Sequence, residues 1–347
     1  MKPTLLSIAI PTYNRANFLD QNLGVIAKQL NALLDEKVEI IVSDNCSSDS
    51  TFETVDRHIN LGLKVKYIKN KENLGWARNF TQCFKMARGK YVLLLGDDDQ
   101  IAPGGLQKLL ECIASSNYGV VAMQPYGYDY DPISEHPKAK KPPLAYEDNN
   151  FFILAVSQFF TLTSALVLNK SLIQNVNPDD YISYDLATFH LFLRASLSSK
   201  KNLYIREFMV ASKRQNSFSY DFADVFIRQF WEIIENHRQF GIKDQTIQSL
   251  LRYRLLSYYP FYMFDIRRNH RSEPSHVARL LKNQYGENLL LKVWLLPILI
   301  LPYYPALIWG ICTTIVGRTL GGGGFRGIVF LKNKIKEFIR VKLKTIA

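Results

Sequence analysis

Cysteine is scarce in this chain. The 347 residues include four, which are Cys46, Cys83, Cys112 and Cys312. No two of them have the spacing of a metal-binding pair, which counts against a zinc site and against a disulfide framework. This usage favours a reducing compartment. A hydrophobic leader is also missing, because a strand-like run begins at about residue 5, and we expect no signal peptide.

A glycine-rich loop is missing after the first apolar run. The run over residues 5–10 ends in Pro11-Thr12-Tyr13-Asn14 and not in Gly-x-Gly-x-x-Gly. This absence counts against a dinucleotide-dependent oxidoreductase, whose phosphate loop needs those glycines. It also counts against a nucleotidyltransferase, which would carry a glycine-rich loop with a basic residue at this point.

Short apolar runs alternate with helix-like stretches through the first hundred residues. The runs cover residues 5–10, 38–42, 65–68 and 91–96, and the stretches between them cover residues 18–34, 50–61 and 74–88. The sequence Ser50-Thr51-Phe52-Glu53 has the form of a capping box at the start of the second helix. The alternation predicts an α/β fold with right-handed βαβ crossovers and a mostly parallel sheet flanked by helices.

Polar clusters follow all four runs. Ligands bind outside the carboxyl ends of the strands in such sheets, so we expect the clusters to meet at one edge. The last cluster is Asp97-Asp98-Asp99, whose like charges repel strongly at low dielectric unless a cation offsets them. Carboxylate oxygens suit Mg²⁺ or Mn²⁺. The alternative is an acidic loop that caps the next helix, with Pro103 in the first turn of that helix.

The side chains of these clusters suit a nucleoside diphosphate. Tyr13 offers an aromatic face, Asp44 offers an acceptor for a base N–H, and Arg78 offers a guanidinium that matches a phosphate. Asn45 and Asn73 add amides that form hydrogen bonds. Each residue also has an ordinary structural explanation, as strand-end packing, a turn residue or a solvated cation.

Four stretches in this order resemble glycosyltransferase family 2, whose members have the GT-A fold and move a sugar from a nucleotide donor. They are residues 10–15, 39–51, 73–79 and 89–99. In the family, the first two stretches contact the base and the third lies near the ribose and pyrophosphate. The donor site that the resemblance implies comprises Pro11, Tyr13, Asn14, Asp44, Asn45, Asn73, Arg78, Asp97, Asp98 and Arg214.

The resemblance also implies a metal site for Mn²⁺ or Mg²⁺ at Asp98 and Asp99. The usual first aspartate of the family motif falls on Gly96, and Asp97 stands where the family often has a small residue. We therefore expect Asp99 to bind the metal. Asp97 or Asp98 is expected to contact the ribose and the metal together.

Inverting sugar transfer needs a general base that takes the proton from the acceptor hydroxyl. The residue that matches the family's base is Asp185, and its structural alternative is an acid at a helix N-terminus. Asp179 and Asp180 are competing candidates. The basic cluster at residues 213–217 resembles a late loop of the family that closes over the donor phosphates, which is the expectation for Arg214. A solvated basic turn is the alternative.

The C-terminal region is first apolar and then basic. Residues 293–316 carry no charge, and this length spans a bilayer if the helix is straight. Pro297, Pro302 and Pro305 favour a broken, re-entrant or interfacial helix instead. Residues 318–347 carry eight basic side chains and one acid, and residues 326–345 have the pattern of a basic amphipathic helix. This favours contact with an anionic membrane over a nucleic acid. A soluble helical hairpin or a dimer interface is the alternative.

These features predict a donor half at residues 1–125, an acceptor half with the base at 126–235 and a helical, membrane-associating region at 236–347. The expected partners are a UDP, dTDP, GDP or CDP sugar, a lipid-linked oligosaccharide and the membrane surface. No nucleic acid is expected, and homo-oligomerisation stays open.

Residues 164–170 and Tyr184-Asp185 are similar to bacterial O-antigen transferases of the abequosyltransferase type. The resemblance implies a metal-dependent, inverting transferase at the cytoplasmic face of the inner membrane, bound peripherally or inserted by its C-terminus. The alternative is a non-catalytic, nucleotide-sugar-binding scaffold of a polysaccharide assembly complex.

Overall fold

The computed structural model describes residues 3–33, 37–139, 141–214, 221–269, 273–286 and 288–320. The chain divides into two compact units. One consists of residues 1–219 and 232–243, and the other of residues 220–231 and 244–347. The division falls within α7 (Phe230–Asn236). The predicted donor half lies in the first unit, and its functional separation from an acceptor half stays a prediction.

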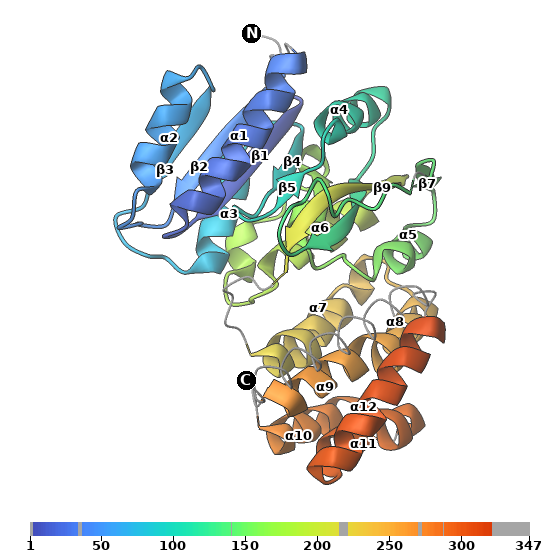
Figure 1. Ribbon diagram of the computed structural model, residues 1–347. Helices are drawn as coiled ribbons and strands as arrows, with labels where there is room; N and C mark the ends of the chain where they lie inside the picture. Colours follow the sequence, from blue (N-terminus) through green and yellow to red (C-terminus); the bar gives the residue numbers. More distant parts are fainter. Residues whose placement is uncertain are drawn as a thin grey trace, which may run out of the picture. The chain divides into compact units, whose positions relative to one another are not determined.

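The N-terminal part of the first unit alternates strands and helices, as predicted (Figure 1). The strands are β1 (Leu6–Thr12), β2 (Val38–Asp44), β3 (Val65–Lys69) and β4 (Tyr91–Leu94), separated by α1 (Ala16–Leu33), α2 (Thr51–Asn60) and α3 (Trp76–Met86). The four strands are parallel and lie in the order β3-β2-β1-β4. Their carboxyl ends therefore lie along one edge of the sheet.

The same sheet continues from β4 in the order β8-β6-β9-β5, and β7 pairs with β9. The strands are β5 (Gln100–Ile101), β6 (Val120–Tyr128), β7 (Leu144–Tyr146), β8 (Leu166–Asn169) and β9 (Asn202–Lys213). The helices are α4 (Gly105–Ser115), α5 (Asn149–Val156) and α6 (Ala187–Leu197), with 3₁₀ turns at Thr163–Ala165, Lys170–Leu172, Pro178–Tyr181 and Arg238–Phe240. Because β8 runs antiparallel to β4, the sheet changes direction beside the aspartate triplet.

Apolar side chains of the strands and helices form the core of the first unit. α1 contacts α4, and α3 contacts α6. Ile8, Leu19, Leu93, Leu106 and Val121 belong to one buried cluster with the inner residues of β2 and β9. A close-packed core is hardly compressible, so it fixes the positions of the strand ends.

The predicted capping box at Ser50 is wrong. Ser50 precedes α2, but its side chain makes no hydrogen bond to the helix. Asp49 takes this part, because its carboxylate accepts from the backbone N–H of Thr51 at 3.1 Å and from that of Ala16 at 3.0 Å. Burial alone would raise the pKa of Asp49, but these hydrogen bonds lower it. One carboxylate thus ties the starts of α1 and α2 together.

The second unit is helical where it is described. Its α-helices are α8 (Asp244–Tyr253), α9 (Tyr259–Asn269), α10 (Pro274–Tyr285), α11 (Leu296–Ile300) and α12 (Tyr303–Arg318), and π-helical segments lie at Asp224–Gln229, Arg254–Tyr258 and Leu291–Leu295. The apolar segment at 293–316 is broken between α11 and α12. Pro302 explains the break, since it lacks an amide N–H and keeps Leu301 extended, at φ −68° and ψ 158°.

Within the described residues, no helix has both the length and the apolar character needed to cross a membrane. The break between α11 and α12 confirms the expectation of a broken apolar segment. The basic amphipathic helix predicted at 326–345 lies outside the described residues.

Candidate active site

The aspartate triplet lies directly after β4 and is buried. Asp97, Asp98 and Asp99 are 3%, 6% and 6% exposed. Arg15, in the loop after β1, donates from Nη1 to Asp97 Oδ1 at 2.8 Å and from Nη2 to Asp98 Oδ2 at 2.9 Å. Thr12 Oγ1 donates to the other oxygen of Asp97 at 2.8 Å. The guanidinium bridges two carboxylates and offsets part of their repulsion, a role that sequence analysis gave to a metal alone.

Asn22 and Ser164 fix the backbone around the triplet. Asn22, on α1, donates from Nδ2 to the carbonyl oxygens of Gly96 at 2.9 Å and Asp99 at 2.8 Å. Ser164 Oγ accepts from the N–H of Gly96 at 2.9 Å. Sequence analysis missed Asn22, and it included Ser164 in the stretch 164–170 without giving it a role. A signal for Asn22 was present, because it is an amide on the apolar face of α1, three residues after the buried Leu19.

The triplet does not cap the following helix. α4 begins at Gly105, after Gly104 in the left-handed region at φ 76°, and no side chain caps it. Pro103 lies before the helix and not in its first turn. The structural alternative considered for the triplet is therefore wrong.

Burial makes the triplet electrostatically unusual. It raises the pKa of Asp99 to about 7, and the charge of Asp98 adds to the rise, despite hydrogen bonds from Ser164, Ser212 and the backbone of Lys213. Burial also raises the pKa of Asp97 to about 7, although Arg15 and Thr12 act in the opposite direction. Buried carboxylates of this kind are typical of sites where a bound cation stabilises the charged form.

Gly96 leaves a space that oxygen atoms surround. A Cβ at this position would lie 3.2 Å from Asp98 Oδ1, 3.3 Å from Asp99 Oδ2 and 3.4 Å from Ser164 Oγ. This donor set fits Mg²⁺ or Mn²⁺. No group of three or more His, Cys, Asp or Glu residues in the described part of the chain has a metal-binding arrangement. A cation at Asp98 and Asp99 would need further ligands from water or phosphate, as is common for Mg²⁺.

The raised pKa of Asp99 predicts how the metal-free protein responds to pH. Between about pH 4 and pH 7 the unfolded chain releases a proton that the folded chain retains, so stability falls as the pH rises and then levels off. Asp99→Asn removes this contribution. One pKa unit corresponds to about 1.4 kcal/mol, so we expect the variant to be more stable than the parent at pH 8 by about 4 kcal/mol, and no more stable at pH 4, in urea unfolding with chelator.

Asp131→Asn is the matched control for that measurement. Asp131 is exposed, and hydrogen bonds from Ser134 and then Ile133 lower its pKa, so its replacement should give no gain at pH 8. Equal stabilities of the parent and Asp99→Asn at pH 8 would contradict the raised pKa of the buried Asp99.

The loops after β1 and β2 are joined by hydrogen bonds. The N–H of Asn14 donates to Ser47 Oγ at 2.8 Å, and Asn14 Oδ1 accepts from the N–H of Ser48 at 2.8 Å. Asn14 has φ +52°, a left-handed conformation that Asn adopts more readily than most residues. Pro11 lies in β1 beside Ser43 of β2, and Tyr13 is 43% exposed. The structure therefore brings Asn14 to the loop after β2 and Pro11 beside the end of β2.

Asp44 ends β2 and is fully buried. Its Oδ2 accepts from the hydroxyl of Tyr67 at 2.6 Å, and its Oδ1 accepts from the N–H of Ser47 at 2.8 Å. Burial, followed by this hydrogen bond, raises the pKa of Tyr67. The carboxylate is thus held in one orientation, and its contact with a nucleotide base stays a prediction.

Asn45 and Asn73 stabilise the turn before α3. Asn45 Nδ2 donates to Asn73 Oδ1 at 2.7 Å, and Asn45 Oδ1 accepts from the N–H of Leu74 at 2.9 Å. Asn73 Oδ1 also accepts from the N–H of Gly75, whose φ of +79° suits glycine. Arg78 follows in α3 and is exposed. The ribose and phosphate contacts of Asn73 and Arg78 stay predictions.

Asp185 lies in the turn between Pro178–Tyr181 and α6. Its Oδ1 accepts from the indole Nε1 of Trp76, at the start of α3, at 3.1 Å. Asp185 does not cap α6, since the N-cap position is Leu186 and no side chain caps the helix. Asp185 is thus neither the N-cap residue of α6 nor an acid of its first turn, and its role as a base stays a prediction. Trp76 lies in the family-like stretch 73–79, but the sequence analysis gave it no role.

The two competing base candidates have exposed partners of their own. Asp179 pairs with Lys85 Nζ at 2.5 Å, and both side chains are about half exposed. Asp180 accepts from Asn177 Nδ2 at 3.0 Å. Asp185 also has a partner, Trp76, so the choice of Asp185 as the base stays a prediction.

Arg214 follows β9 and is held by two acids. Its Nη1 lies 2.7 Å from Asp129 Oδ2 and 3.6 Å from Glu135 Oε2. Its backbone N–H donates to the carbonyl oxygen of Tyr128 at 2.9 Å. A contact with donor phosphates would require Arg214 to leave these acids, and this role stays a prediction. Residues 215–217 of the same cluster lie outside the described residues.

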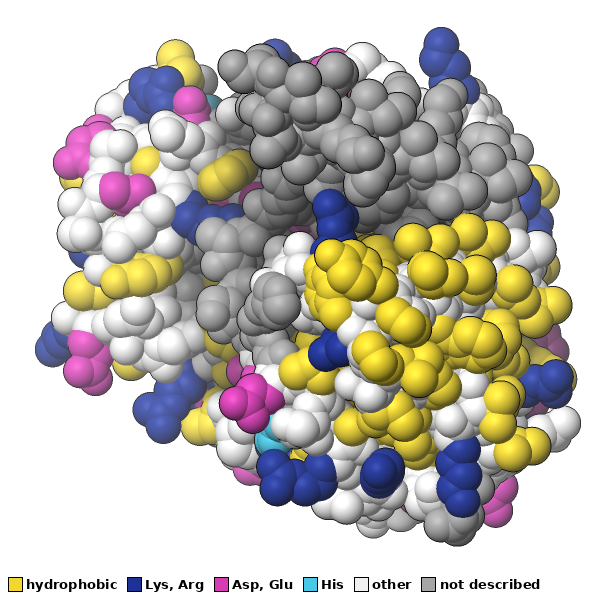
Figure 2. Space-filling model, turned by 60° about the horizontal axis from the view of Figure 1, so that its bottom comes forward, with side chains coloured by type: hydrophobic (Ala, Val, Ile, Leu, Met, Phe, Trp, Pro, Cys, Tyr) yellow, Lys and Arg dark blue, Asp and Glu magenta, His cyan; other side chains and the backbone are white. Residues whose placement is uncertain are grey.

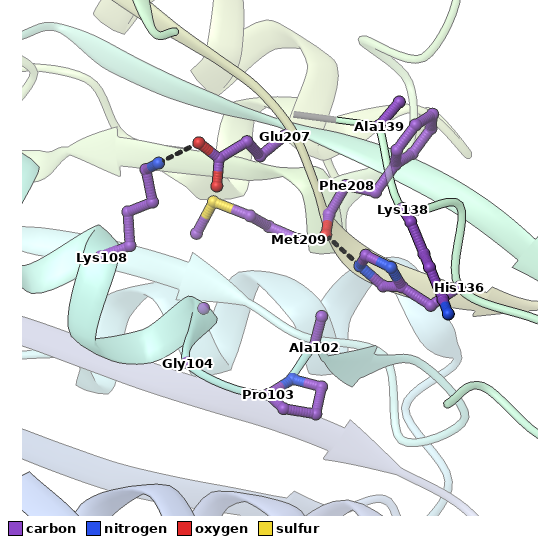
Figure 3. Close-up of a pocket in the computed structure, with 11 residues that line it drawn as sticks. Ala102, Pro103, Gly104, Lys108, His136, Lys138, Ala139, Glu207, Phe208 and Met209 are labelled. Atoms are coloured by element: carbon purple, nitrogen blue, oxygen red, sulfur yellow. Dashed lines mark hydrogen bonds and ion pairs between the residues drawn. The ribbon is translucent and has the colours of Figure 1, made fainter. Parts of the chain in front are cut away.

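A cavity of about 370 Å³ lies beside the start of α4 (Figure 3). Lys108 forms an ion pair with Glu207 on its wall, and His136 Nε2 hydrogen-bonds to the carbonyl oxygen of Phe208 at 2.9 Å. None of the predicted donor, metal or base residues lines this cavity. The site predicted at the strand ends is therefore separate from this cavity.

Residues 7–175 match the family model described as glycosyl transferase family 2. A segment of 103 residues is 40% identical to abequosyltransferase RfbV of Salmonella typhimurium. This segment covers 29% of this chain and 30% of that protein. A segment of 138 residues is 36% identical to validoxylamine A glucosyltransferase of Streptomyces hygroscopicus, which covers 39% of this chain and 31% of that protein. The matches thus span about a third of the length of these relatives.

Two solved structures share the fold over most of the chain. TarS 1–349 of S. aureus, solved with UDP-GlcNAc, aligns with a TM-score of 0.51 and 16% identity, covering 93% of this chain and 92% of that one. Mannosyltransferase PcManGT of Pyrobaculum calidifontis, solved with GDP-Man and Mn²⁺, aligns with a TM-score of 0.53 and 16% identity, covering 92% and 87%. The predicted α/β fold of GT-A type is thereby confirmed.

Proposed function

Since residues 7–175 form a glycosyl transferase family 2 domain, we propose that this protein transfers a sugar from a nucleotide donor to a hydroxyl group of a glycan. The observation that carries the proposal is the meeting of buried carboxylates with the loops after β1 and β2, at the edge of a parallel sheet where ligands bind. The structural neighbours support it, because they were solved with UDP-GlcNAc and with GDP-Man.

The donor is proposed to be a UDP, dTDP, GDP or CDP sugar. Tyr13 is proposed to stack on the base, which its exposed ring supports, and Asp44 and Asn45 fix the neighbouring loop after β2. Arg78 supplies a cation that matches the diphosphate bidentately. Asn73 orients the turn that presents Arg78, through its hydrogen bond with Gly75.

Asp98 and Asp99 are the residues that would hold Mn²⁺ or Mg²⁺. A divalent cation there supplies a Lewis acid for the charge that develops on the departing nucleoside diphosphate. Arg15 bonds to Asp97 Oδ1 and Asp98 Oδ2, so it shares the carboxylate of Asp98 with the proposed cation. The proposal draws support from the oxygen-lined space at Gly96 and from the Mn²⁺ named for a structural neighbour.

Asp185 is proposed as the general base. It takes the proton of the acceptor hydroxyl while the hydroxyl oxygen forms a bond to the anomeric carbon. The bond from that carbon to the diphosphate oxygen breaks, and the electron pair leaves with the nucleotide. Attack from the opposite side inverts the configuration, through a transition state with oxocarbenium character. Trp76 acts as a positioning residue, because its N–H holds one oxygen of Asp185.

The acceptor is proposed to be a lipid-linked oligosaccharide in bacterial surface polysaccharide or O-antigen synthesis. Support comes from the similarity to abequosyltransferase RfbV over 103 residues and from the uncharged segment at 293–316. Both fit an enzyme at the cytoplasmic face of the inner membrane, which meets its donor in water and its acceptor at a lipid surface.

Release of the nucleoside diphosphate tests this function. The four donor classes, each with a radiolabelled sugar, are incubated with the protein, Mn²⁺ and a bacterial lipid extract. We expect one class to release its nucleotide and to label the lipid fraction. A donor that binds but is never consumed would favour the alternative, a non-catalytic scaffold of a polysaccharide assembly complex.

A further inference from the structure

α12 has the reverse of the usual amphipathic pattern. Its buried positions are small or hydroxylated residues, namely Ala306, Gly310, Thr313, Thr314 and Gly317. Its outer positions include Tyr304 and Ile308, which are 76% and 65% exposed. A helix at a water-facing surface normally turns its large apolar residues inward. The reversal indicates that the outer side of α12 meets a medium other than water.

The small residues let α12 pack closely on its own unit. A Cβ at Gly310 would lie 3.0 Å from Phe264 Cδ2 on α9, and one at Gly317 would lie 1.9 Å from the carbonyl oxygen of Leu256. Ser257 Oγ donates to the carbonyl oxygen of Gly317 at 2.6 Å. Close backbone approach through small residues is common between helices in lipid, where large side chains turn outward.

The outer side of α12 belongs to a larger apolar face. We define this face by the exposed large side chains of residues 289–320, which are Leu289, Val293, Ile300, Tyr303, Tyr304, Ile308, Trp309, Val316 and Leu320. Figure 2 shows a broad area of exposed hydrophobic side chains on one side of the molecule, with Lys and Arg side chains near it. Extended apolar areas on a protein surface mark interaction sites.

The positive charge around the apolar face favours a binding partner that carries negative charge. Residues 288–320 contain no acidic residue, and their two charged residues, Lys292 and Arg318, lie toward either end of the apolar run. Residues 244–347 carry sixteen basic and five acidic side chains, which accounts for eleven of the twelve net positive charges of the chain. Apolar side chains together with cations match acyl chains and anionic headgroups.

We propose that this apolar face docks in the interface of a membrane that contains anionic lipid, with α12 lying in the membrane plane. α12 has 16 residues and is therefore about 24 Å long, whereas the hydrocarbon core is about 30 Å thick. Ile308 would enter the acyl layer, and Tyr304 and Trp309 suit the headgroup boundary. This face would bind the lipid surface that carries the proposed acceptor. The biological purpose of the docking therefore rests on the proposed function.

Vesicle flotation of the full-length protein tests the proposal. Vesicles of phosphatidylglycerol and phosphatidylcholine should bind the parent, and vesicles of phosphatidylcholine alone should bind it less. Ile308→Asp should weaken partitioning at least about tenfold, since it places a charge in the acyl layer. Ile133→Asp is the matched control, because Ile133 is 69% exposed in the first unit, and it should bind like the parent.

Three results would overturn the proposal. The first is equal partitioning of Ile308→Asp and the parent, and the second is no binding of the parent to anionic vesicles. The third is a dimeric parent, by light scattering without lipid, that Ile308→Asp converts to a monomer, because a second copy would then cover the face. Nucleotide binding in the same preparations should be equal for all three proteins. Its loss in all three would count against the proposed function and not against the docking face.

Discussion

Asp185→Asn should lower kcat for sugar transfer by about 10²–10⁴-fold, the usual contribution of a positioned general base. Asparagine has a similar shape and can still accept from the indole N–H of Trp76, so the fold and the hydrogen bond at 3.1 Å should survive. Donor affinity should stay unchanged, because Asp185 acts on the acceptor. The measurement is turnover with the consumed donor, together with the donor Kd by calorimetry.

Two further variants make this result specific. Asp180→Asn, in the same segment, should keep parental turnover, since Asp180 bonds to Asn177. Trp76→Phe keeps an aromatic ring but removes the donor to Asp185, and should lower kcat about tenfold with no change in donor Kd. Near-parental turnover of Asp185→Asn would refute the base assignment.

Arg15→Ala should lower the free energy of unfolding of the metal-free protein by about 3 kcal/mol at pH 8. The guanidinium is 15% exposed and the two carboxylates are 4% and 6% exposed, so its removal leaves buried charges uncompensated. Mn²⁺ should recover part of this loss. It should also bind the variant more tightly than the parent, because the cation no longer competes with Arg15. Urea unfolding and calorimetric Mn²⁺ titration measure the two effects.

Arg57→Ala is the control for this variant. Arg57 pairs with Asp20 at 2.6 Å, but the two side chains are 55% and 38% exposed, so the loss should stay below about 1 kcal/mol. A similar small loss in Arg15→Ala, or weaker Mn²⁺ binding by that variant, would contradict competition between Arg15 and a cation for the same carboxylates.

The order of strands and helices in the first hundred residues was predictable because its signals are local. Apolar runs such as residues 38–42 end at turn residues, and the amphipathic stretches between them have helical spacing. The parallel topology followed from the crossover rule. The prediction that the polar clusters after all four strands meet followed from the rule that ligands bind outside the carboxyl ends of parallel strands. The family motifs then assigned chemistry to those loops.

The contacts within the site were less predictable, because they join residues far apart in the chain. Arg15 lies 82 residues before Asp97, and Trp76 lies 109 residues before Asp185. No spacing rule indicates such pairs. At Ser50 a local rule was misleading, since Asp49 already accepted from the backbone of both α1 and α2. Asp49 and Ser50 are adjacent candidates for the cap of α2, and the tertiary contact with Ala16 selected Asp49.

The C-terminal region shows the same division between local and tertiary information. The proline pattern predicted a broken apolar segment, and the break falls at Pro302. The orientation of α12 was not predictable, because an almost entirely apolar helix gives no signal for its inner side. Packing against α9 selected the small residues for that side and left Ile308 outside.

The most direct test of a metal-assisted nucleotide-sugar site is nucleotide-dependent thermal stability. The parent is heated with UDP, GDP, CDP or dTDP, each with Mn²⁺ and each with chelator. The account predicts that one nucleotide stabilises the protein, by about 2.7 kcal/mol at a hundredfold excess over its Kd, and that the chelator removes the effect. No stabilisation by any of the four nucleotides with Mn²⁺ would contradict it.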